Sequence, residues 1–349
     1  MGILAICSYI VVAGLVVFFS IKLSDYVDLL DKKTNVSGAF LGGILLAAVT
    51  SLPELFTSLT ATIMIRDNHY VVGNILGSDL FNMCLFFIIY IFFFGKMVKE
   101  KVNKSHILSL TITAIMYGLT VIASFIFDFH GCLIGWFNPI SIAILAMYVF
   151  SIIKTPKEEE SESDDDNSTL TVKQIITLFI VFSILLIGAS IGMTYLVDWI
   201  SNIFSIGSTF GGAIFLGVAT SLPEMTATIQ LSKKKNFNAA YGNIIGSCVF
   251  NFFILTLADA LSFLVKDEAG NYIGIYRMDQ STFLLIICSF VSIIALMITL
   301  VIKQKGKLKD TVGYRILYYA VAIILVTSYI VFTVLSNIDL GLSFAPIAA

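Results

Sequence analysis

The sequence predicts an all-α polytopic membrane protein with about ten transmembrane helices, arranged as two five-helix halves of inverted topology. Three observations carry this prediction: the composition, the distribution of basic residues between alternate loops, and a pair of motifs that occurs once in each half. The 349 residues are 58% hydrophobic and only 13% charged, with a mean hydropathy of +0.95. Soluble domains have about a quarter of their residues charged, so little of this chain is available for a soluble domain.

Apolar runs long enough to cross a bilayer, about 20 residues each, recur along the chain. The first run has no basic leader and no clear cleavage site, so we interpret it as a retained span and not as a signal peptide. The ten spans are expected at approximately residues 3–31, 36–65, 70–95, 105–128, 135–154, 172–201, 206–232, 237–264, 281–303 and 312–336.

Basic residues are concentrated in alternate loops, which sets the predicted orientation. The even-numbered loops and their flanks hold only Arg66, Lys266 and Arg277. Because positively charged loops stay in the cytoplasm, we expect the odd-numbered loops to be cytoplasmic and both termini to lie outside. The basic residues of the odd-numbered loops are Lys32, Lys33, Lys96, Lys99, Lys101, Lys104, Lys154, Lys157, Lys173, Lys233, Lys234, Lys235, Lys303, Lys305, Lys307, Lys309 and Arg315.

A short polar segment divides the chain into two halves. Residues 155–171 lie within the run KTPKEEESESDDDNSTLTVK, whose acidic composition predicts a disordered cytoplasmic linker. Weak cation binding by the acidic run is the alternative. The halves are residues 1–154 and 172–349.

The two halves share two motifs. Residues 42–54 read GGILLAAVTSLPE and residues 212–224 read GAIFLGVATSLPE, while GNILGSDLFN at 73–82 matches GNIIGSCVFN at 242–251. We therefore place one repeat at about 36–95 and the other at about 206–264. Each half has five spans, an odd number, so the second copy enters the membrane from the opposite side. Inverted repeats of this kind are typical of alternating-access transporters.

Each TSLPE motif places a proline beside a carboxylate near the middle of a span. Pro53 and Pro223 interrupt helical hydrogen bonding, and the carbonyls of Thr50 and Thr220 are candidates for release. The spacing also fits a capping box, in which Ser51 or Ser221 caps the helix whose third residue is the glutamate. An ionisable residue within a span indicates function, so Glu54 and Glu224 are the principal candidate site residues.

The span after each TSLPE motif carries polar residues on one helix face. Four-residue spacing aligns Asn74, Ser78 and Asn82, and the second half repeats this pattern with Asn243, Gly246, Ser247 and Asn251. The glycine pairs 73/77 and 242/246 permit close helix contact. Carboxylate, hydroxyl, amide and carbonyl oxygens suit hard cations such as Ca²⁺ and Na⁺ and argue against zinc or copper.

Charge balance favours obligatory exchange. Glu54 and Glu224 together carry two negative charges, which one Ca²⁺ neutralises. An empty site would leave both charges uncompensated within the membrane, so Na⁺ ions or protons must refill the site before it reorients. Three Na⁺ per Ca²⁺ would make the exchange electrogenic.

At these residues the chain resembles the cation/Ca²⁺ exchanger superfamily, and within it the Na⁺/Ca²⁺ exchangers. The resemblance implies a central Ca²⁺ ligated by Glu54 and Glu224 with the carbonyls of Thr50 and Thr220. It implies that Asn82 and Asn251 complete this cluster, and that spans one and six slide to alternate access. It also implies two flanking Na⁺ sites, one made by Ser51, Ser78 and the backbone of Ala47, the other by Ser221, Ser247 and the backbone of Gly217.

Some positions depart from relatives within that superfamily. Asn251 replaces an aspartate that the K⁺-dependent branch carries, which makes K⁺ co-transport less favoured. Asp79 stands where many relatives have asparagine, about 100° around the helix from Ser78, and we favour a packing or supporting role for it over ligation. The short linker also argues against a large regulatory Ca²⁺-sensing domain.

Three other functions remain to be weighed. Proton-coupled Ca²⁺ exchange is the main alternative, because protons could neutralise the two glutamates. A cation channel fits inverted halves less well. A membrane enzyme would need a nucleophile, a base or a catalytic metal, and neither the three histidines nor the five cysteines are spaced for one. We therefore expect no cofactor, with Ca²⁺, Na⁺ and the lipid bilayer as partners and no nucleic-acid or protein partner.

Overall fold

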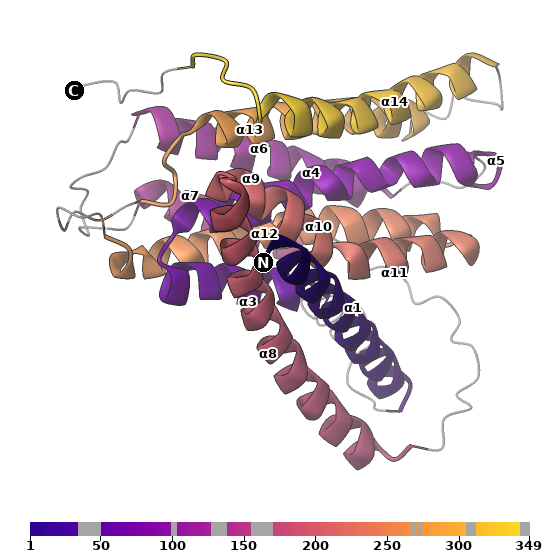
Figure 1. The fold of residues 1–349 in the computed structure, drawn as a ribbon. Coiled ribbons are helices and arrows are strands. Elements are labelled where there is room, and N and C mark those ends of the chain that lie inside the picture. The colour runs from indigo at the N-terminus through magenta and orange to yellow at the C-terminus, as the bar shows by residue number, and fades with distance from the viewer. Residues whose placement is uncertain are drawn as a thin grey trace.

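The computed structural model describes residues 1–33, 50–98, 103–126, 138–154, 170–266, 270, 272, 274–304 and 312–342. Within these ranges the chain is helical, apart from connecting segments and one isolated bridge between Lys266 and Tyr272. Figure 1 shows most of the helices side by side in one bundle, with α1 and α8 extending away from it. The all-helical prediction is confirmed for the described residues.

The described part of the first half contains six α-helices and one π-helix. These elements are α1 (Gly2–Lys33), α3 (Leu52–Thr60) with the π-helix η2 (Ala61–Ile65), α4 (Asn68–Phe92), α5 (Phe94–Met97), α6 (Lys104–Ile126) and α7 (Pro139–Lys154).

The second half has a comparable order of elements, except that its π-helix precedes the proline motif, whereas that of the first half follows it. Its elements are α8 (Val172–Phe204), α9 (Ser208–Gly211), the π-helix η3 (Gly212–Leu216), α10 (Gly217–Thr220), α11 (Leu222–Lys233), α12 (Phe237–Leu261), the 3₁₀ turn η4 (Ser262–Leu264), α13 (Gln280–Gln304) and α14 (Val312–Leu335).

Seven described helices are long and apolar enough to cross a membrane, and the bent segment 208–233 makes an eighth candidate. Two predicted spans are represented by shorter apolar helices, Leu52–Ile65 and Pro139–Lys154. The beginning of the second predicted span lies outside the described residues. The multi-pass membrane architecture therefore holds, while the count of ten spans stays a prediction.

Contacts between connecting segments group them at two ends of the bundle. At one end Lys33 Nζ donates to the carbonyl of Leu170, and Lys303 Nζ donates to that of Met97. At the other end Ser208 Oγ donates to Asp67 Oδ2, and Thr209 Oγ1 donates to Asp279 Oδ2. Each of these contacts thus joins residues in or next to two odd-numbered predicted loops, or in or next to two even-numbered ones, as alternating spans require. Which end faces the cytoplasm stays a prediction, as does the acidic linker, most of which lies outside the described residues.

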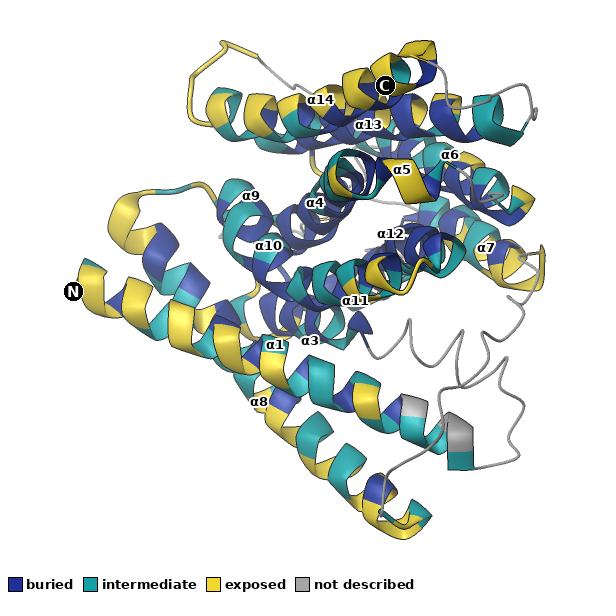
Figure 2. Ribbon diagram, turned by 90° about the vertical axis from the view of Figure 1, so that its right-hand side faces the viewer, coloured by how far each residue is buried: buried dark blue, intermediate teal, exposed yellow. Residues whose placement is uncertain are grey.

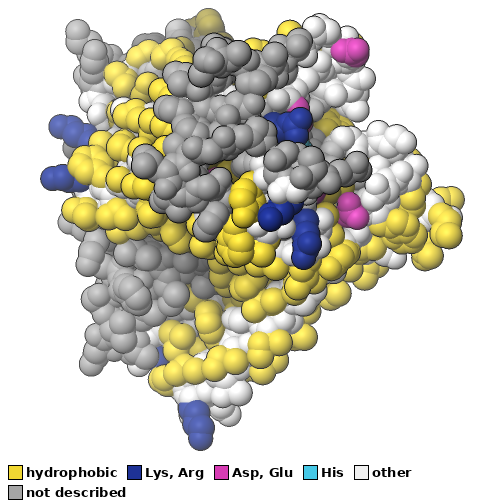
Figure 3. All heavy atoms as spheres, turned by 90° about the vertical axis from the view of Figure 1, so that its left-hand side faces the viewer, with side chains coloured by type: hydrophobic (Ala, Val, Ile, Leu, Met, Phe, Trp, Pro, Cys, Tyr) yellow, Lys and Arg dark blue, Asp and Glu magenta, His cyan; other side chains and the backbone are white. Residues whose placement is uncertain are grey.

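Burial separates a core from a peripheral pair of helices. Two-thirds (67%) of the most apolar window of α4 and of α12 is buried, against 17% for α1 and for α8 (Figure 2). The pair α1–α8, which we call the arm, is held together by aromatic contacts of Phe182 with Phe18, Phe19 and Tyr26 at ring-centroid distances of 5.6–6.1 Å. Apolar side chains are frequent along the lower edge of the face in Figure 3, to the right of the grey region, as expected for a surface that contacts lipid.

Close backbone contact fixes the position of α4 against the second half. A Cβ on Gly77 would lie 2.5 Å from Ala213 Cα, and one on Gly73 would overlap the carbonyl oxygen of Thr209. Only glycine allows this approach, which is the function of small-xxx-small pairs. No corresponding contact of Gly246 lies within the described residues.

Candidate cation-binding site

Two interruptions of helical structure lie at the centre of the bundle. In the second half the helix bends by 41° at Ser221 (φ −88°, ψ 1°), and Pro223 stands in the first turn of α11. In the first half Ser51 has nearly the same backbone angles (φ −93°, ψ 11°), with Pro53 in the first turn of α3. Because proline has no N–H to donate to the preceding turn, each helix restarts at the motif, as the sequence predicted.

The serine at each break reaches the glutamate of the other half. Ser51 Oγ donates to Glu224 Oε1 (3.3 Å), and Ser221 Oγ donates to Glu54 Oε1 (3.3 Å). Neither serine makes a side-chain capping bond to its own helix, so the predicted capping boxes are wrong. A carboxylate inside the membrane gains more from a hydroxyl donor than a backbone N–H gains from a hydroxyl acceptor, which favours the pairing across the halves.

Both glutamates are enclosed and only partly satisfied. Glu54 is 1% exposed and Glu224 is 0% exposed, and their charges lie near enough to repel each other. The hydroxyls of Thr220 and Thr50 also approach Glu54 and Glu224, respectively, again across the halves. The Oε2 atom of each glutamate is buried without a hydrogen-bond partner among the described residues. Two neighbouring carboxylates with one unsatisfied oxygen each form a site that a cation would stabilise.

An asparagine braces the helix beyond each break. Asn74 Nδ2 donates to the carbonyl of Glu54 (3.2 Å), to Thr57 Oγ1 (2.9 Å) and to Ser58 Oγ (2.9 Å). Asn243 Nδ2 donates in the same way to the carbonyl of Glu224 (3.2 Å) and to Thr228 Oγ1 (3.1 Å). These asparagines fix the direction of the helix that carries each glutamate, a role that the one-face polar pattern did not reveal.

The serines of the GNxxGS motifs also pair across the halves. Ser78 Oγ donates to the carbonyl of Gly217 (3.1 Å) and lies 3.3 Å from Thr220 Oγ1. Ser247 Oγ lies 3.5 Å from Ser51 Oγ and donates to Glu224 Oε1 (3.4 Å).

These contacts change the grouping of the two implied Na⁺ sites. The resemblance placed Ser51 with Ser78, and Ser221 with Ser247, whereas the structure places Ser78 with Gly217 and Ser51 with Ser247. The cause is the glycine contact of α4 with η3, because it brings Ser78 against α10 of the other half. Ala47 lies outside the described residues.

Two amides complete the predicted set. Asn82 is 0% exposed, and neither of its polar side-chain atoms has a hydrogen-bond partner among the described residues. Asn251 is 1% exposed, and its Nδ2 donates to Asp79 Oδ1 (2.9 Å), while its Oδ1 has no partner in the described part of the chain. Asp79 thus directly contacts a predicted site residue, which the helical-wheel argument from the sequence could not show.

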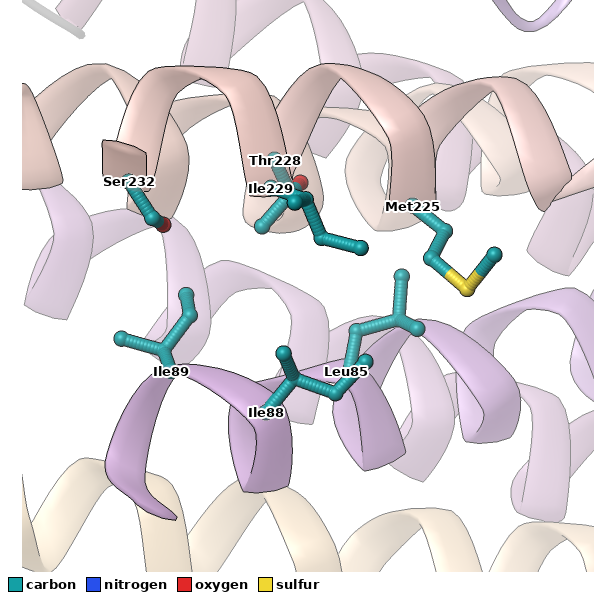
Figure 4. Close-up of a pocket in the computed structure, with 7 residues that line it drawn as sticks. All are labelled: Leu85, Ile88, Ile89, Met225, Thr228, Ile229 and Ser232. Atoms are coloured by element: carbon teal, nitrogen blue, oxygen red, sulfur yellow. The ribbon is translucent and has the colours of Figure 1, made fainter. Parts of the chain in front are cut away.

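The groove beside Glu224 is closed. Figure 4 shows a crevice between α4 and α11, lined by Leu85, Ile88, Ile89, Met225, Thr228, Ile229 and Ser232. The crevice leaves no room for a water molecule. Met225 directly follows Glu224, so apolar packing of α11 on α4 separates the carboxylate from the end of α11 in this conformation.

Oxygen atoms supply the ligand chemistry of the site. The side chains around the two glutamates are serine, threonine and asparagine, and no group of three or more His, Cys, Asp or Glu side chains placed to hold a metal occurs within the described ranges. Oxygen donors with few carboxylates are suited to hard cations.

The fold and this arrangement define the class of protein: a polytopic helical membrane protein whose duplicated halves meet at a buried pair of carboxylates. The sequence profile of the family described as "Sodium/calcium exchanger protein" matches residues 4–154 and 175–337. The chain therefore belongs to this family of Ca²⁺/cation exchangers, which are transporters and not enzymes.

Curated relatives and solved structures agree with this assignment. The chain is 26% identical to inner membrane protein YrbG of Escherichia coli over 259 residues (71% of this chain, 76% of the relative). It is 24% identical to the sodium/calcium exchanger MaX1 of Methanosarcina acetivorans over 294 residues (70% of this chain, 80% of the relative).

Two solved exchangers share the fold. The crystal structure of the H⁺/Ca²⁺ exchanger CAX matches with a TM-score of 0.63 and 13% identity, over 95% of this chain and 90% of that one. The sodium–calcium exchanger NCX_Mj soaked with Na⁺ and Sr²⁺ matches with a TM-score of 0.54 and 20% identity, over 94% of this chain and 99% of that one.

Proposed function

We propose that this chain is a secondary antiporter that exchanges Ca²⁺ for Na⁺ by alternating access at a site within the membrane. The single observation that carries the proposal is the reciprocal pairing of Ser51 with Glu224 and Ser221 with Glu54. Each carboxylate is built into the interface of the two halves, so a bound cation would interact with both halves at once. A movement of peripheral helices past this interface would change the exposure of the site without dismantling it.

The oxygen atoms divide into a central set and two flanking sets. Glu54 and Glu224, with the carbonyls of Thr50 and Thr220, would hold Ca²⁺, and Asn82 and Asn251 would complete its shell. Ser78, Thr220 and the carbonyl of Gly217 would hold one Na⁺. Ser51 and Ser247 would hold another, and Ala47, which the resemblance adds to Ser51, lies outside the described residues. Ser221 would keep Glu54 oriented in either state.

The hydroxyl groups favour Na⁺ over protons as the coupling ion. A proton needs only a carboxylate, whereas Na⁺ needs several oxygen ligands, and hydroxyls from both halves surround the glutamates. The curated similarity to MaX1 supports the same choice. The alternative is proton-coupled Ca²⁺ exchange, which the two glutamates alone could perform and which the fold similarity to CAX keeps open.

The arm is the moving part in this proposal. Its two helices are the least buried spans, and the arm meets the core through contacts such as Tyr9 OH to the carbonyl of Phe215 (2.8 Å). A displacement of α1 and α8 along the core would break few core contacts while uncovering the site on one side and covering it on the other.

The test is uptake of radioactive Ca²⁺ by proteoliposomes loaded with Na⁺, with K⁺, or with an outward proton gradient. We expect uptake only from Na⁺-loaded vesicles, stimulated by a membrane potential that favours the exit of positive charge. Glu54→Gln and Glu224→Gln should each abolish it. Thr111→Ala is the control, because its exposed hydroxyl bonds only the carbonyl of Ile107 and Met297 Sδ, away from the site.

Each other outcome has a distinct meaning. Uptake driven by a proton gradient alone would be consistent with the proposed Ca²⁺ site, but it would show that the coupling ion is H⁺ and not Na⁺. Indifference to the membrane potential would contradict an electrogenic stoichiometry. Absence of Ca²⁺ uptake under all three gradients would overturn the proposed substrate.

A further inference from the structure

Asp79 occupies a buried position between two hydrogen-bond donors. It is 1% exposed and follows Ser78 on α4. Its Oδ1 accepts from Asn251 Nδ2 of α12 (2.9 Å), and its Oδ2 accepts from Tyr117 OH of α6 (3.0 Å). Both carboxylate oxygens are therefore used as acceptors, and the Cys248 thiol of α12 approaches the same carboxylate.

The hydrogen bond between Asp79 and Asn251 determines the orientation of the Asn251 amide. A primary amide has one oxygen that accepts and one nitrogen that donates, and its hydrogen-bond partners fix its orientation. A carboxylate whose two oxygens both accept must meet the nitrogen. The amide oxygen of Asn251 is consequently turned away from Asp79, and it is buried without a partner among the described residues.

The free oxygen belongs to the face of α12 that carries the site. Asn251 lies four residues after Ser247, so the two side chains share a face of the helix, and Ser247 Oγ donates to Glu224 Oε1 (3.4 Å). An amide oxygen held on that face is a ligand for a hard cation.

The equivalent position in the other half has no such clamp. Asn82 is the repeat counterpart of Asn251, and the counterpart of Asp79 is Cys248, a weak hydrogen-bonding group. Both polar atoms of the Asn82 side chain are without partners in the described part of the chain. The duplicated site is therefore unequal: a carboxylate holds the Asn251 amide, whereas the Asn82 side chain lies beside the Cys248 thiol, a weak hydrogen-bonding group.

We propose that Asp79 is a positioning residue, which with Tyr117 clamps the Asn251 amide so that its oxygen, and not its nitrogen, faces the transported cation. The inference rests on the proposed cation site and deepens it by assigning a role to a carboxylate outside the predicted ligand set. Groups that orient metal ligands typically affect metal affinity by about 10–100-fold when they are removed.

The experiment measures Ca²⁺ binding to the purified full-length protein by calorimetry, together with its thermal unfolding. Asp79→Leu removes the acceptor and should weaken Ca²⁺ binding by about 10–100-fold. Asp79→Asn can still present its oxygen to Asn251 while its nitrogen donates to the Tyr117 hydroxyl, so it should lose no more than about threefold. Such rescue by the conservative variant would separate orientation of the amide from the charge of Asp79.

Swapping the side chains of Asp79 and Asn251 between the two positions provides a sharper test. Asn251→Asp alone places two carboxylates in contact and should strongly weaken binding. The double variant Asp79→Asn with Asn251→Asp restores one nitrogen facing one carboxylate, and it should recover Ca²⁺ binding to within about tenfold of the parent. This comparison decides the matter even where Asp79→Leu does not fold.

Asp259→Asn is the matched control. Asp259 is another buried carboxylate of α12, about 12 Å further along the helix axis, where it accepts from Ser141 Oγ (2.7 Å) and from the backbone N–H of Asn138 (3.0 Å). Its substitution should lower the unfolding temperature and leave the Ca²⁺ dissociation constant unchanged.

Two results would overturn the positioning role of Asp79 while leaving the proposed function intact. One is a folded Asp79→Leu variant that binds Ca²⁺ like the parent. The other is a double variant, Asp79→Asn with Asn251→Asp, that binds Ca²⁺ no better than Asn251→Asp alone. A parent protein that binds no Ca²⁺ would instead overturn the proposed function and, with it, the role of the Asn251 oxygen as a ligand.

Discussion

Ser51 and Ser221 link the two halves of the chain directly at the candidate site. Each sits at the break of its own helix and donates to the glutamate of the opposite half at 3.3 Å. A hydrogen bond to a charged group is worth about 1.5–3 kcal/mol. Loss of either serine therefore affects the other half's carboxylate, although the substitution is made 167–173 residues away in the sequence.

We expect Ser51→Ala and Ser221→Ala each to weaken apparent Ca²⁺ or Na⁺ affinity by about tenfold, because about 1.4 kcal/mol corresponds to a factor of ten. Ion titrations of exchange in proteoliposomes would measure the shift. Ser183→Ala is the control, since its hydroxyl bonds the carbonyl of Phe179 within the arm. Affinities that match the parent in both serine variants would show that these cross-half bonds are incidental to ion binding.

The residues of the candidate site also show how much of it could be predicted from the sequence. The duplicated TSLPE and GNxxGS motifs were sufficient to identify Glu54 and Glu224 and the polar positions around them. The sequence did not show that the serines pair across the halves, because local capping rules consider only the nearest turn of helix. Asp79 was given only a general packing or supporting role for a related reason: its partners, Tyr117 and Asn251, come from helices whose packing no local pattern specifies.

At the scale of elements, the contact of α4 with η3 fixes the position of the first half relative to the second. Gly73 and Gly77 allow the backbones to touch, and Gly217 of α10 in turn faces the backbone N–H of Ser78, where an added Cβ would lie at 2.8 Å. The GxxxG pattern predicted close packing, but not the partner helix. That missing partner is why the sequence did not place Ser78 beside Gly217 of the other half.

We expect Gly77→Ala to destabilise the protein by about 1–3 kcal/mol through overpacking against Ala213, and to reduce exchange because Ser78 is displaced from Gly217. Thermal unfolding in detergent would measure the stability. Gly118→Ala is the matched control, since an added Cβ there meets nothing within 4 Å. It should be neutral or stabilising by up to about 1 kcal/mol. Equal effects of the two substitutions would count against a tight interface at α4.

At the scale of the whole molecule, the arm and the core are distinct in burial and in the contacts that join them. One contact between them is that of Tyr70 OH on α4 with Asp198 Oδ1 on α8 (3.2 Å). Contacts inside the arm are aromatic and join α1 to α8, so the two helices would move as one unit.

We expect a reversible thiol cross-linker between Tyr70→Cys and Asp198→Cys to stop Ca²⁺ exchange, and reduction of the linker to restore it. The measurement is Ca²⁺ uptake before and after reduction, in a background from which the native exposed thiol Cys7 has been removed. A cross-link inside the arm, between Phe18→Cys and Phe182→Cys, is the control and should leave exchange intact. Normal exchange with the arm fixed to the core would refute a moving arm.

The orientation of the whole molecule is a separate prediction. Single cysteines introduced at Lys234 and Lys266 lie in an odd-numbered and an even-numbered predicted loop. We expect an impermeant thiol reagent added outside whole cells to label Lys266→Cys only, and Lys234→Cys to be labelled only after the membrane is opened. The reverse pattern would invert the assigned topology, and labelling of both from one side would contradict the alternation of the spans.

The sparse packing of the arm has a consequence for the surroundings of the protein. Large apolar side chains such as Ile10, Val11, Ile180 and Ile184 are 53–64% exposed on α1 and α8, so acyl chains must rearrange whenever the arm moves. The viscosity and order of the bilayer would then oppose the proposed movement of the arm directly, in the way that solvent friction opposes the opening of a soluble enzyme. If the arm moves as proposed, stiffer membranes should slow turnover while leaving the equilibrium affinity for ions nearly unchanged.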